Sequence, residues 1–548
     1  MAFSRLSASA VLASMIFLLY WTTSSARSHD LSAPHRVRRD MPSGTREKVS
    51  ASVTMLKESL AVVKDVVGKS NTRTVSAVIK SIANLASLAP GITGLVSSFL
   101  NLVLIFIPQD NPLTELRAGF AEVNKKLDSL SVQISNLATD VEWFNYASVY
   151  SQDEVRILNA WKKFNEFREN SELTESEDNN LRLAEVFTKY YENTATEASV
   201  ANLYHYLTVS DMSLSGNLNL LLRKKFKCDV REIGRYNLYF SSLLWKGMLL
   251  NQLYWKLIGL QQTGINAQYT KMFKNVSSAQ ISAIEFCVNN YQQYLQKDVE
   301  EIGKALDPSN KRVVAEEVKN FLDKKYYWYY WVVLVFNSDT DQDYYHVFFS
   351  EVIKAEANPI TIAVSYVDKE GETYRDEVIK AVKHCNPMKT PPFGPFLAPD
   401  FTPCKIILQQ IQDCNILVHG VPLREYVKST YATNDNDWLE APDSLMYLQC
   451  KSSRNLYSMS IFYSRTVDPC PANQCERGEC KRLGKSSEHL CECPDNYYGD
   501  RCETELESKD IPAINAGRMV PDITAISAKL KAMETKLDAI LNNTCPAL

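Results

Sequence analysis

The chain has 548 residues, a hydrophobic content of 45%, an aromatic content of 10% and a formal net charge of −4. This balance excludes the basic footprint that nucleic-acid-binding proteins carry, so no nucleic-acid partner is expected. The length exceeds the roughly 250 to 300 residues at which a single hydrophobic core stops growing, so we expect several domains.

Residues 1–26 have the three-part layout of a secretory signal peptide. Arg5 precedes the apolar run VLASMIFLLYW, and small residues up to Ala26 follow it. The apolar run is too short to span a bilayer, which favours a cleaved signal over a membrane anchor. We therefore predict cleavage after Ala26 and a secreted, extracellular protein.

A second processing signal follows in the tetrad RVRR, which contains Arg36, Arg38 and Arg39. Convertases of the secretory pathway cleave after basic residues of this kind. The tetrad therefore predicts a propeptide over residues 27–39. The alternative interpretation is a solvated basic linker.

Residues 40–323 are predicted to form a helical domain, because their apolar residues recur at steps of three and four. Within this domain, the stretch SIANLASLAPGITGLVSSFLNLVLIFIPQ at residues 81–109 contains no charged side chain. A Pro-Gly pair and a further glycine divide the stretch into two helical arms, so we predict an apolar hairpin. The candidate hairpin residues are Ile82, Leu85, Pro90, Gly91, Gly94, Leu95, Phe99, Leu102 and Ile105.

The hairpin has two interpretations. The arm from Leu95 to Ile107 reaches only about 20 Å, whereas a bilayer core is about 30 Å thick, so neither arm spans a membrane alone. The hairpin is either an ordinary core element, or a segment that the surrounding helices shelter until it inserts into a target-cell membrane. Both interpretations require shelter, because so wide an apolar face would cause association in water.

From Leu113 to Val141 the apolar residues keep a strict alternation of three and four over four heptads. Such a seam predicts a long helix in a bundle or a coiled coil. It would also let several copies of the chain associate, so a homo-oligomer is a candidate assembly.

Residues 324–467 change character and predict a smaller α+β region. The stretches YYWYYWVVLVF, ITIAVSYVD and LMYLQC are rich in aromatic and β-branched residues. These residue types favour the pleated surface of a sheet, so we predict strands at all three places.

Residues 468–504 contain six cysteines with the spacing C-x4-C-x4-C-x10-C-x-C-x8-C, and Tyr498 and Gly499 precede the last of them. Six cysteines alone allow fifteen connectivities. The spacing resembles an EGF-like domain, and this resemblance implies the disulfides Cys470–Cys480, Cys475–Cys491 and Cys493–Cys502. The residues of the calcium-binding version are missing, so no calcium site is predicted. The module acts either as a spacer or as a receptor-binding element.

Residues 505–548 are predicted to be a linker and a short amphipathic helix, because apolar residues from Ile523 to Ile540 again alternate. Seven cysteines lie outside the EGF-like pattern, so one of them lacks a partner within the chain. Cys545 is the candidate for an intermolecular bridge, and pairing with the main body is the alternative. Asn275 and Asn542 begin glycosylation triplets.

The chain contains none of the motifs HExxH, GxSxG, GxxxxGK[ST] and GxGxxG, which mark common catalytic and phosphate-binding sites. Its seven histidines are scattered. We therefore predict no catalytic, cofactor-binding or metal-ligating residue, and we expect a non-enzyme.

The apolar hairpin is followed by ELRAGFAEVNKKLDSLSVQISNLATDVEW. This combination, in a secreted helical chain with an EGF-like module downstream, resembles the cephalotoxin-like family and the related rapunzel-type helical proteins. The resemblance covers roughly residues 45–320 and the EGF-like module. It implies a secreted protein of a toxin-like class, and it supplies no catalytic residues.

The predicted fold is mainly α: an N-terminal helical bundle with a buried apolar hairpin, an α+β region, an EGF-like module and a C-terminal amphipathic helix. Two function classes remain. One is a toxin-like protein that acts on membranes through the hairpin. The other is a non-toxic extracellular or matrix protein, whose helical body is a scaffold and whose EGF-like module and C-terminal helix contact a cell-surface or matrix protein.

Overall fold

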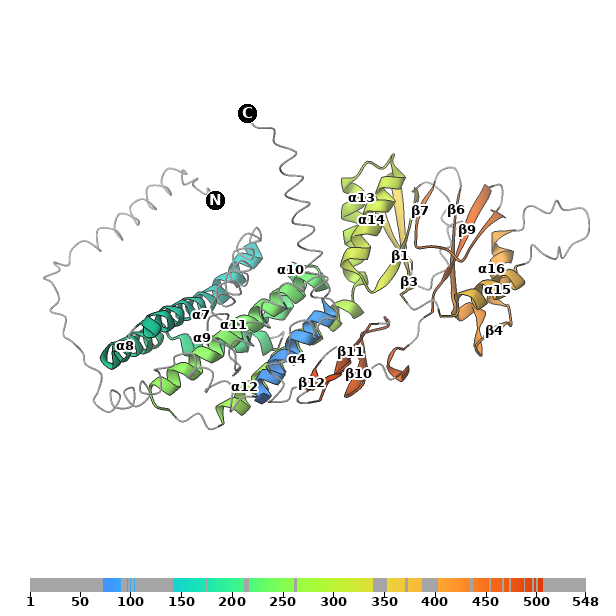
Figure 1. Ribbon diagram of the computed structural model, residues 1–548. Coiled ribbons are helices and arrows are strands. Elements are labelled where there is room, and N and C mark those ends of the chain that lie inside the picture. Colours follow the sequence, from blue (N-terminus) through green and yellow to red (C-terminus); the bar gives the residue numbers. More distant parts are fainter. Residues whose placement is uncertain are drawn as a thin grey trace, which may run out of the picture.

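The computed structural model of the chain is shown in Figure 1. The structure describes residues 72–89, 96, 99, 103, 141–173, 176–210, 216–260, 264–338, 352–369, 373–386, 403–433, 437–452, 455–465, 468–472, 475–486, 488–494, 497–498 and 501–505. The predicted signal peptide, propeptide, heptads from residue 113 to 140 and C-terminal helix lie outside these residues.

The first part of the described chain is a layer of helices, which lies on the left in Figure 1. It consists of α4 (Thr72–Leu88), α7 (Val141–Leu173), α8 (Glu177–Asn193), α9 (Thr196–Thr208), α10 (Leu218–Lys225), α11 (Val230–Leu257) and α12 (Ile265–Asn289). The mainly α class predicted from the sequence is confirmed by this layer and by the four further helices of the described residues.

Helix α11 is the centre of this layer and packs against α4, α7, α8, α9, α10 and α12. It is buried on nearly all sides because these neighbours surround it, and its buried residues include polar ones such as Asn237 and Lys246. Asp229 begins the helix, since its carboxylate accepts hydrogen bonds from the backbone N–H groups of Arg231 and Glu232. A disulfide between Cys228 and Cys287 joins this end of α11 to the end of α12.

The second part is a four-stranded antiparallel sheet in the order β2-β3-β1-β7. Its strands are β1 (Tyr329–Asn337), β2 (Ile353–Ala357), β3 (Ile360–Asp368) and β7 (Trp438–Glu440). Side chains of β1 alternate between two clusters: Val333 and Val335 join the main core, whereas Leu334 and Phe336 join a second cluster on the other face. Burial on both faces explains why the sequence of β1 is a continuous apolar run.

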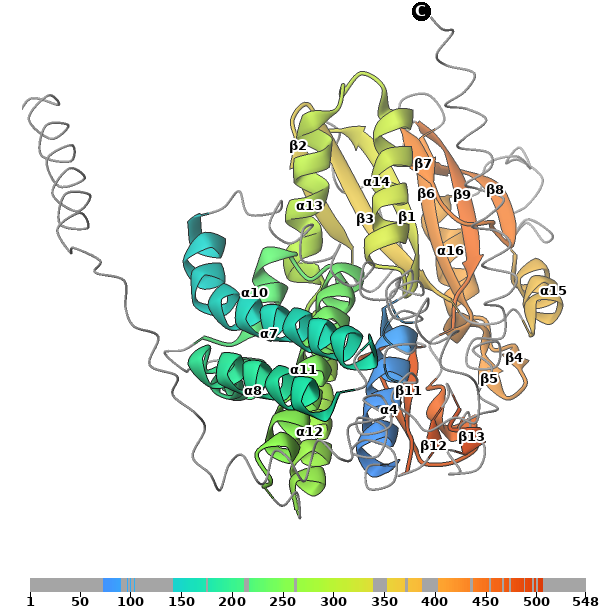
Figure 2. The same cartoon turned by 60° about the vertical axis from the view of Figure 1, so that its left-hand side comes forward.

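Helices α13 (Gln292–Ala305) and α14 (Lys311–Lys325) cover one face of this sheet (Figure 2). Gly303 lets α13 approach closely, because a Cβ at this position would lie 2.6 Å from the Ile362 side chain and 2.8 Å from the Ala357 Cβ. Helix α13 falls before the predicted domain boundary at residue 323, and α14 crosses this boundary. The unit formed by the sheet and the two helices that pack on it therefore begins at Gln292, the first residue of α13.

The other face of the sheet meets a smaller unit that contains a three-stranded sheet in the order β6-β9-β8. The unit includes β6 (Val427–Thr433), β8 (Met446–Ser452), β9 (Asn455–Tyr463), the short hairpin β4 (Leu417–Val418) and β5 (Val421–Pro422), α15 (Arg375–Cys385) and α16 (Cys404–Gln412). Disulfides Cys385–Cys414 and Cys404–Cys450 cross-link it. The three predicted strand regions correspond to β1, β3 and β8, so these predictions are confirmed.

The described chain ends in a small unit, residues 470–505, which we call the cysteine-rich module. It contains β10 (Glu479–Arg482) paired with β11 (His489–Glu492), and β12 (Tyr497–Tyr498) paired with β13 (Thr504–Glu505). Its disulfides are Cys470–Cys480, Cys475–Cys491 and Cys493–Cys502. These are the same three pairs that the resemblance to an EGF-like domain implies.

Buried tyrosines give the helical layer and its junction with the sheet a dependence on alkaline pH. Burial raises the pKa of Tyr191, Tyr269 and Tyr326 well above the ordinary value. A raised folded-state pKa contributes stability that is fully present below the unfolded value of about 10 and is lost as the pH rises further. We expect each of these tyrosines to lower the free energy of unfolding by about 1.4 kcal/mol between pH 9 and pH 11.

Urea unfolding at pH 9, 10 and 11, combined with phenolate absorbance at 295 nm, tests this expectation. The buried tyrosines should ionise only as the chain unfolds. Ionisation of all tyrosines near pH 10 in the folded protein would contradict it.

Candidate functional site

The first arm of the predicted hairpin is helix α4. The spacing Val75, Val78, Ile82, Leu85 and Ala89 produces an apolar stripe, and the helix ends before Pro90, which disfavours continuation of a helix. Ile82 and Leu85 are 0% and 1% exposed and belong to the main core. Between Thr74 and Ala89 every residue except Ser87 is buried or half-buried, so the helix is covered on all sides.

A pair of helices and a pair of strands cover α4. Helices α11 and α12 lie along one side, and strands β11 and β12 of the cysteine-rich module lie along another (Figures 1 and 2). The Thr74 and Thr270 hydroxyls lie 2.8 Å apart and form a hydrogen bond between α4 and α12. On the module side, the Lys80 ammonium donates a hydrogen bond to the carbonyl oxygen of Cys493.

The end of α4 is held by the junction between the helical layer and the sheet. The hydroxyl of Tyr327 donates a hydrogen bond of 2.8 Å to the Leu88 carbonyl oxygen. The last carbonyl groups of a helix have no partner within the helix, so this contact satisfies one of them. Burial, followed by the charge of Glu488, raises the pKa of Tyr327, which keeps its hydroxyl a neutral donor.

The second arm of the hairpin is described at three positions: Val96, Phe99 and Val103. All three are helical and at most 6% exposed, and all belong to the same core as α4. Of the other candidate hairpin residues, Ile82 and Leu85 are in this core, and the rest lie outside the described residues: Pro90, Gly91, Gly94, Leu95, Leu102 and Ile105. The hairpin itself therefore stays a prediction.

The cysteine-rich module packs against the main body through β10, β11 and the turn between them. Leu483 and Leu490 are 1% and 3% exposed and belong to the main core rather than to the core of the module. The Lys481 ammonium lies 2.6 Å from a carboxylate oxygen of Glu285 on α12. Sequence reasoning missed these contacts. The available signal was Leu483 and Leu490 themselves, because a small disulfide module has almost no core in which to bury them.

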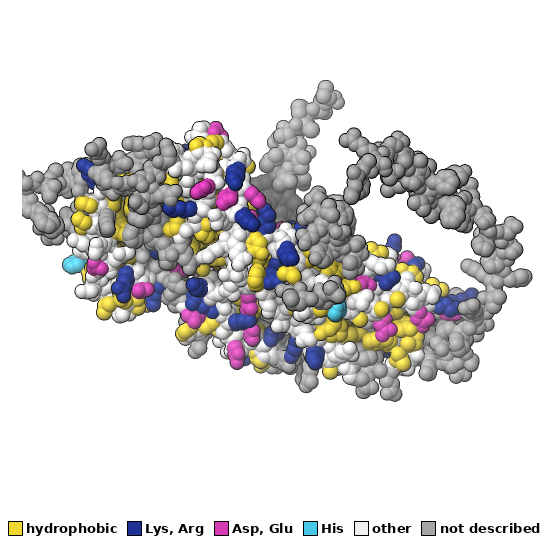
Figure 3. Space-filling view, turned by 180° about the vertical axis from the view of Figure 1, so that it is seen from behind, with side chains coloured by type: hydrophobic (Ala, Val, Ile, Leu, Met, Phe, Trp, Pro, Cys, Tyr) yellow, Lys and Arg dark blue, Asp and Glu magenta, His cyan; other side chains and the backbone are white. Residues whose placement is uncertain are grey.

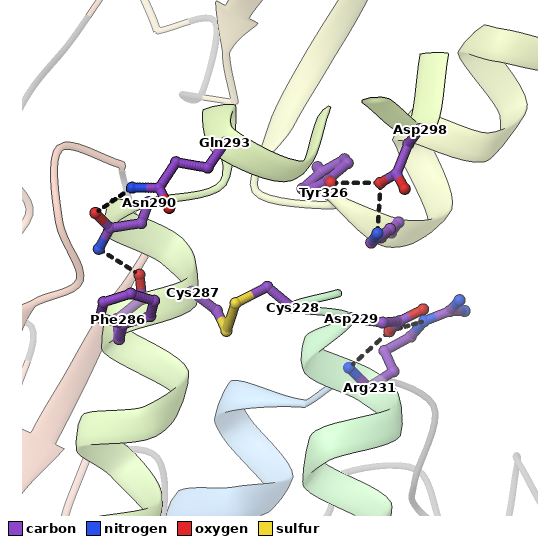
Figure 4. Close-up of a disulfide and its surroundings, with 10 residues drawn as sticks. Cys228, Asp229, Arg231, Phe286, Cys287, Asn290, Gln293, Asp298 and Tyr326 are labelled. Carbon is purple, nitrogen blue, oxygen red and sulfur yellow. Dashed lines mark hydrogen bonds and ion pairs between the residues drawn. A yellow bond between two sulfur atoms is a disulfide. The ribbon is translucent and has the colours of Figure 1, made fainter. Parts of the chain in front are cut away.

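A second candidate site is an open cavity of about 440 Å³ where α10 and α11 meet α13 and α14. Its lining includes Asp298 and Lys325, which form an ion pair with both side chains at most 6% exposed. The Tyr326 hydroxyl donates a hydrogen bond of 2.7 Å to the same carboxylate, and the Cys228–Cys287 disulfide lies nearby (Figure 4). Burial and the Asp298 charge raise the pKa of Tyr326.

This network connects α13 to the end of α14. The Asp298 carboxylate is paired with the Lys325 ammonium and the Tyr326 hydroxyl, which belong to the same network. At the rim of the cavity, Lys227 on the α10–α11 connection forms an ion pair of 2.8 Å with Glu301. Since these charges are paired within the protein, the arrangement fits a structural junction rather than a reaction centre. Within the described residues no group of three or more His, Cys, Asp or Glu side chains could hold a metal ion.

The remaining predicted site residues have separate places. Asn275 is exposed on α12, and its side-chain N–H donates to the Tyr204 hydroxyl at 2.9 Å. Its glycosylation stays a prediction. The twelve cysteines of the described chain form six disulfides, a number that is consistent with an oxidising, extracellular compartment. Six further predicted site residues lie outside the described residues: Ala26, Arg36, Arg38, Arg39, Asn542 and Cys545.

No helix of the described chain has both the length and the apolar character that crossing a bilayer requires. The molecular face in Figure 3 shows Lys and Arg side chains interspersed with Asp and Glu. No basic surface for docking on anionic lipid is evident on that face.

Comparison with known proteins adds one finding about sequence and one about structure. The family model described as "Cephalotoxin-like middle helical domain" matches residues 108–308, a segment that contains all helices from α7 to α13. This match supports the cephalotoxin-like family and a toxin-like protein. It includes neither α4 nor the cysteine-rich module, so the EGF-like character of the module remains an expectation. No solved structure matches the chain.

Proposed function

We propose that this chain is a secreted, non-enzymatic protein of the cephalotoxin-like class that acts on a target-cell membrane through its apolar hairpin. The observation that carries the proposal is the enclosure of α4 together with Val96, Phe99 and Val103 in the helical core. The sequence between α4 and Val96 is uncharged and contains Pro90, Gly91 and Gly94, residue types of low helix propensity. The family match of the neighbouring helices supports the toxin-like class.

The mechanism follows from the length of the arms. Each arm is shorter than the roughly twenty residues that a helical span needs, so one protomer would not form a pore. Insertion of the hairpin would place two apolar arms in one leaflet or across a thinned bilayer, and the heptads from Leu113 to Val141 would bring several protomers together.

Dye release from liposomes tests the proposal. The protein that begins at Asp40 should release dye, and the double substitution Leu102→Asp and Ile105→Asp should reduce release at least about tenfold, because each buried charge costs about 3 kcal/mol at the centre of an inserted helix. The unprocessed chain, measured beside it, tests whether cleavage after Arg39 is needed.

The matched control for this experiment is the double substitution Leu102→Ile and Ile105→Leu, which keeps the apolar surface and should keep release. Circular dichroism and urea unfolding select variants that remain folded. Equal release by the Asp variant and the parent, or no release at any pH and lipid composition, would reject the membrane mechanism.

A second candidate function is that of an extracellular or matrix protein that binds another protein. The observation that favours it is an open cavity of about 380 Å³ beside β6, β7, β8 and β9, whose lining includes Trp438 and Tyr447. These aromatic side chains are 36% and 59% exposed. Exposed aromatic residues are enriched where proteins bind partners. Absence of dye release would favour this function.

A further inference from the structure

We propose that the cysteine-rich module is a releasable clamp that holds α4 in the core. The inference deepens the proposed function, because release of α4 would be the step that frees the hairpin, and its effect at a membrane rests on that function. The clamp itself is a property of the folded chain and can be tested without a membrane.

The module covers the polar side of α4. Lys80 is two residues from Val78 and from Ile82, and two residues correspond to about 200° around a helix, so Lys80 lies opposite the apolar stripe. Its ammonium donates to the Cys493 carbonyl oxygen of the module. The apolar side therefore packs in the helical layer, and the module covers the polar side.

Polar and apolar contacts anchor the module to the main body. Lys481 and Glu285 form the ion pair with α12, and Leu483 and Leu490 enter the main core. The turn between β10 and β11 is pressed against α12 at Gly484, where an added Cβ would lie 2.4 Å from the Asn289 side-chain oxygen and 3.5 Å from Val288. The module thus has a fitted docking site across α4 and α12.

The turn of the module is linked to the end of α4 through Tyr327. Glu488 in this turn is half-buried, and burial raises the pKa of its carboxyl group. Burial, followed by the charge of Glu488, raises the pKa of Tyr327. The hydroxyl of Tyr327 donates a hydrogen bond to the Leu88 carbonyl oxygen at the end of α4. Departure of the module would therefore disturb both the middle and the end of the helix.

The polar contacts of the module can open at low cost. Water can replace the hydrogen bond of Lys80 and the ion pair of Lys481, and an ion pair near the surface contributes little net stability, so exposure of Leu483 and Leu490 to water is the main free-energy cost of release. The three disulfides hold the module together as a unit when it moves. Once the module leaves, the polar side of α4 faces water, which is an acceptable state for an amphipathic helix.

Hydrogen–deuterium exchange of the full chain, without lipid, tests the clamp. Two variants loosen it in independent ways: Lys481→Glu opposes Glu285, and Gly484→Leu places a side chain against Asn289 and Val288. We expect the amides of α4 to exchange at least about tenfold faster in both variants, because local opening of a helix becomes easier when a covering element is lost.

Each variant has a matched control. The charge swap, Lys481→Glu with Glu285→Lys, restores the attraction and should restore slow exchange in α4. The control for Gly484→Leu is Gly420→Leu. Both glycines have a positive φ, +60° at Gly484 and +80° at Gly420, so both substitutions strain the backbone. Nothing lies within 4 Å of a Cβ added at Gly420. It should leave α4 unchanged.

Three outcomes decide between the clamp and the membrane function. Fast exchange in α4 that the charge swap reverses, accompanied by greater dye release, supports both. Fast exchange without any dye release supports the clamp and rejects the proposed membrane function. Unchanged exchange in α4, while the amides of β10 and β11 exchange faster, shows that the module leaves without loosening the helix, and overturns the clamp.

Discussion

Replacing Asp298 by Ala is expected to lower the free energy of unfolding by about 3 to 5 kcal/mol, the range measured when one partner of a buried ion pair is removed. Asp298 lies on α13 and pairs with Lys325 at the end of α14. The side chains are 5% and 6% exposed. The substitution would leave an ammonium buried without its counter-charge.

One further contact makes the loss larger than that of the ion pair alone. The Asp298 carboxylate also accepts the hydrogen bond of the Tyr326 hydroxyl, and Tyr326 is 0% exposed. Removal of the acceptor leaves this hydroxyl without the bond, and an unpaired buried donor costs about 1 to 3 kcal/mol. Because Tyr326 and Lys325 lie at the junction of the helical layer with the sheet, unfolding should begin there.

Urea unfolding monitored by tryptophan fluorescence measures the effect. Glu316→Ala is the control, because the Glu316 pair with Arg312 is exposed and should contribute little to stability. The double substitution Asp298→Leu and Lys325→Met removes both charges and should recover most of the loss. A loss after Asp298→Ala no larger than that of the control would show that the buried pair does not stabilise the junction.

Removal of the Cys228–Cys287 disulfide by substitution of both residues with Ala should lower the free energy of unfolding by about 4 kcal/mol. The bond joins positions that are 59 residues apart, and both cysteines are fully buried. In the loop-closure description, a bond across a loop of this length greatly restricts the unfolded chain. It also fixes the start of α11 against the end of α12, where the cysteine-rich module docks.

Urea unfolding and hydrogen–deuterium exchange of the Cys228→Ala and Cys287→Ala protein measure this effect, with faster exchange expected at the joined ends of α11 and α12. The control removes the Cys385–Cys414 disulfide, which lies in the separate core of α15 and α16. Its loss should accelerate exchange in that region and leave α11 unchanged. An unaltered free energy of unfolding after loss of Cys228–Cys287 would contradict the prediction.

Much of the local structure could be predicted from particular residues. The spacing of Val75, Val78, Ile82 and Leu85 predicts α4, and Pro90 predicts its end. The aromatic and β-branched run that begins at Tyr326 predicts β1. These predictions succeed because helical and strand periodicity are properties of neighbouring residues.

The cysteines show where such reasoning stops. The spacing of the last six described cysteines suggested three pairs through a resemblance, and the structure contains those pairs. The pairs Cys228–Cys287, Cys385–Cys414 and Cys404–Cys450 could not be chosen from spacing, because their members come together only when separate elements pack.

The sequence by itself determined the mainly α class, the uncharged segment at residues 81–109 and the position of the cysteine-rich module. Only the tertiary structure decided that α13 and α14 cover the sheet, that Asp298 forms an ion pair with Lys325, and that the module covers the polar side of α4. Lys80 and Cys493 are separated by 413 residues, and no local pattern relates them. The physical reason is that docking depends on complementary shape and charge between folded elements, whereas periodicity reports only which side of each element is apolar.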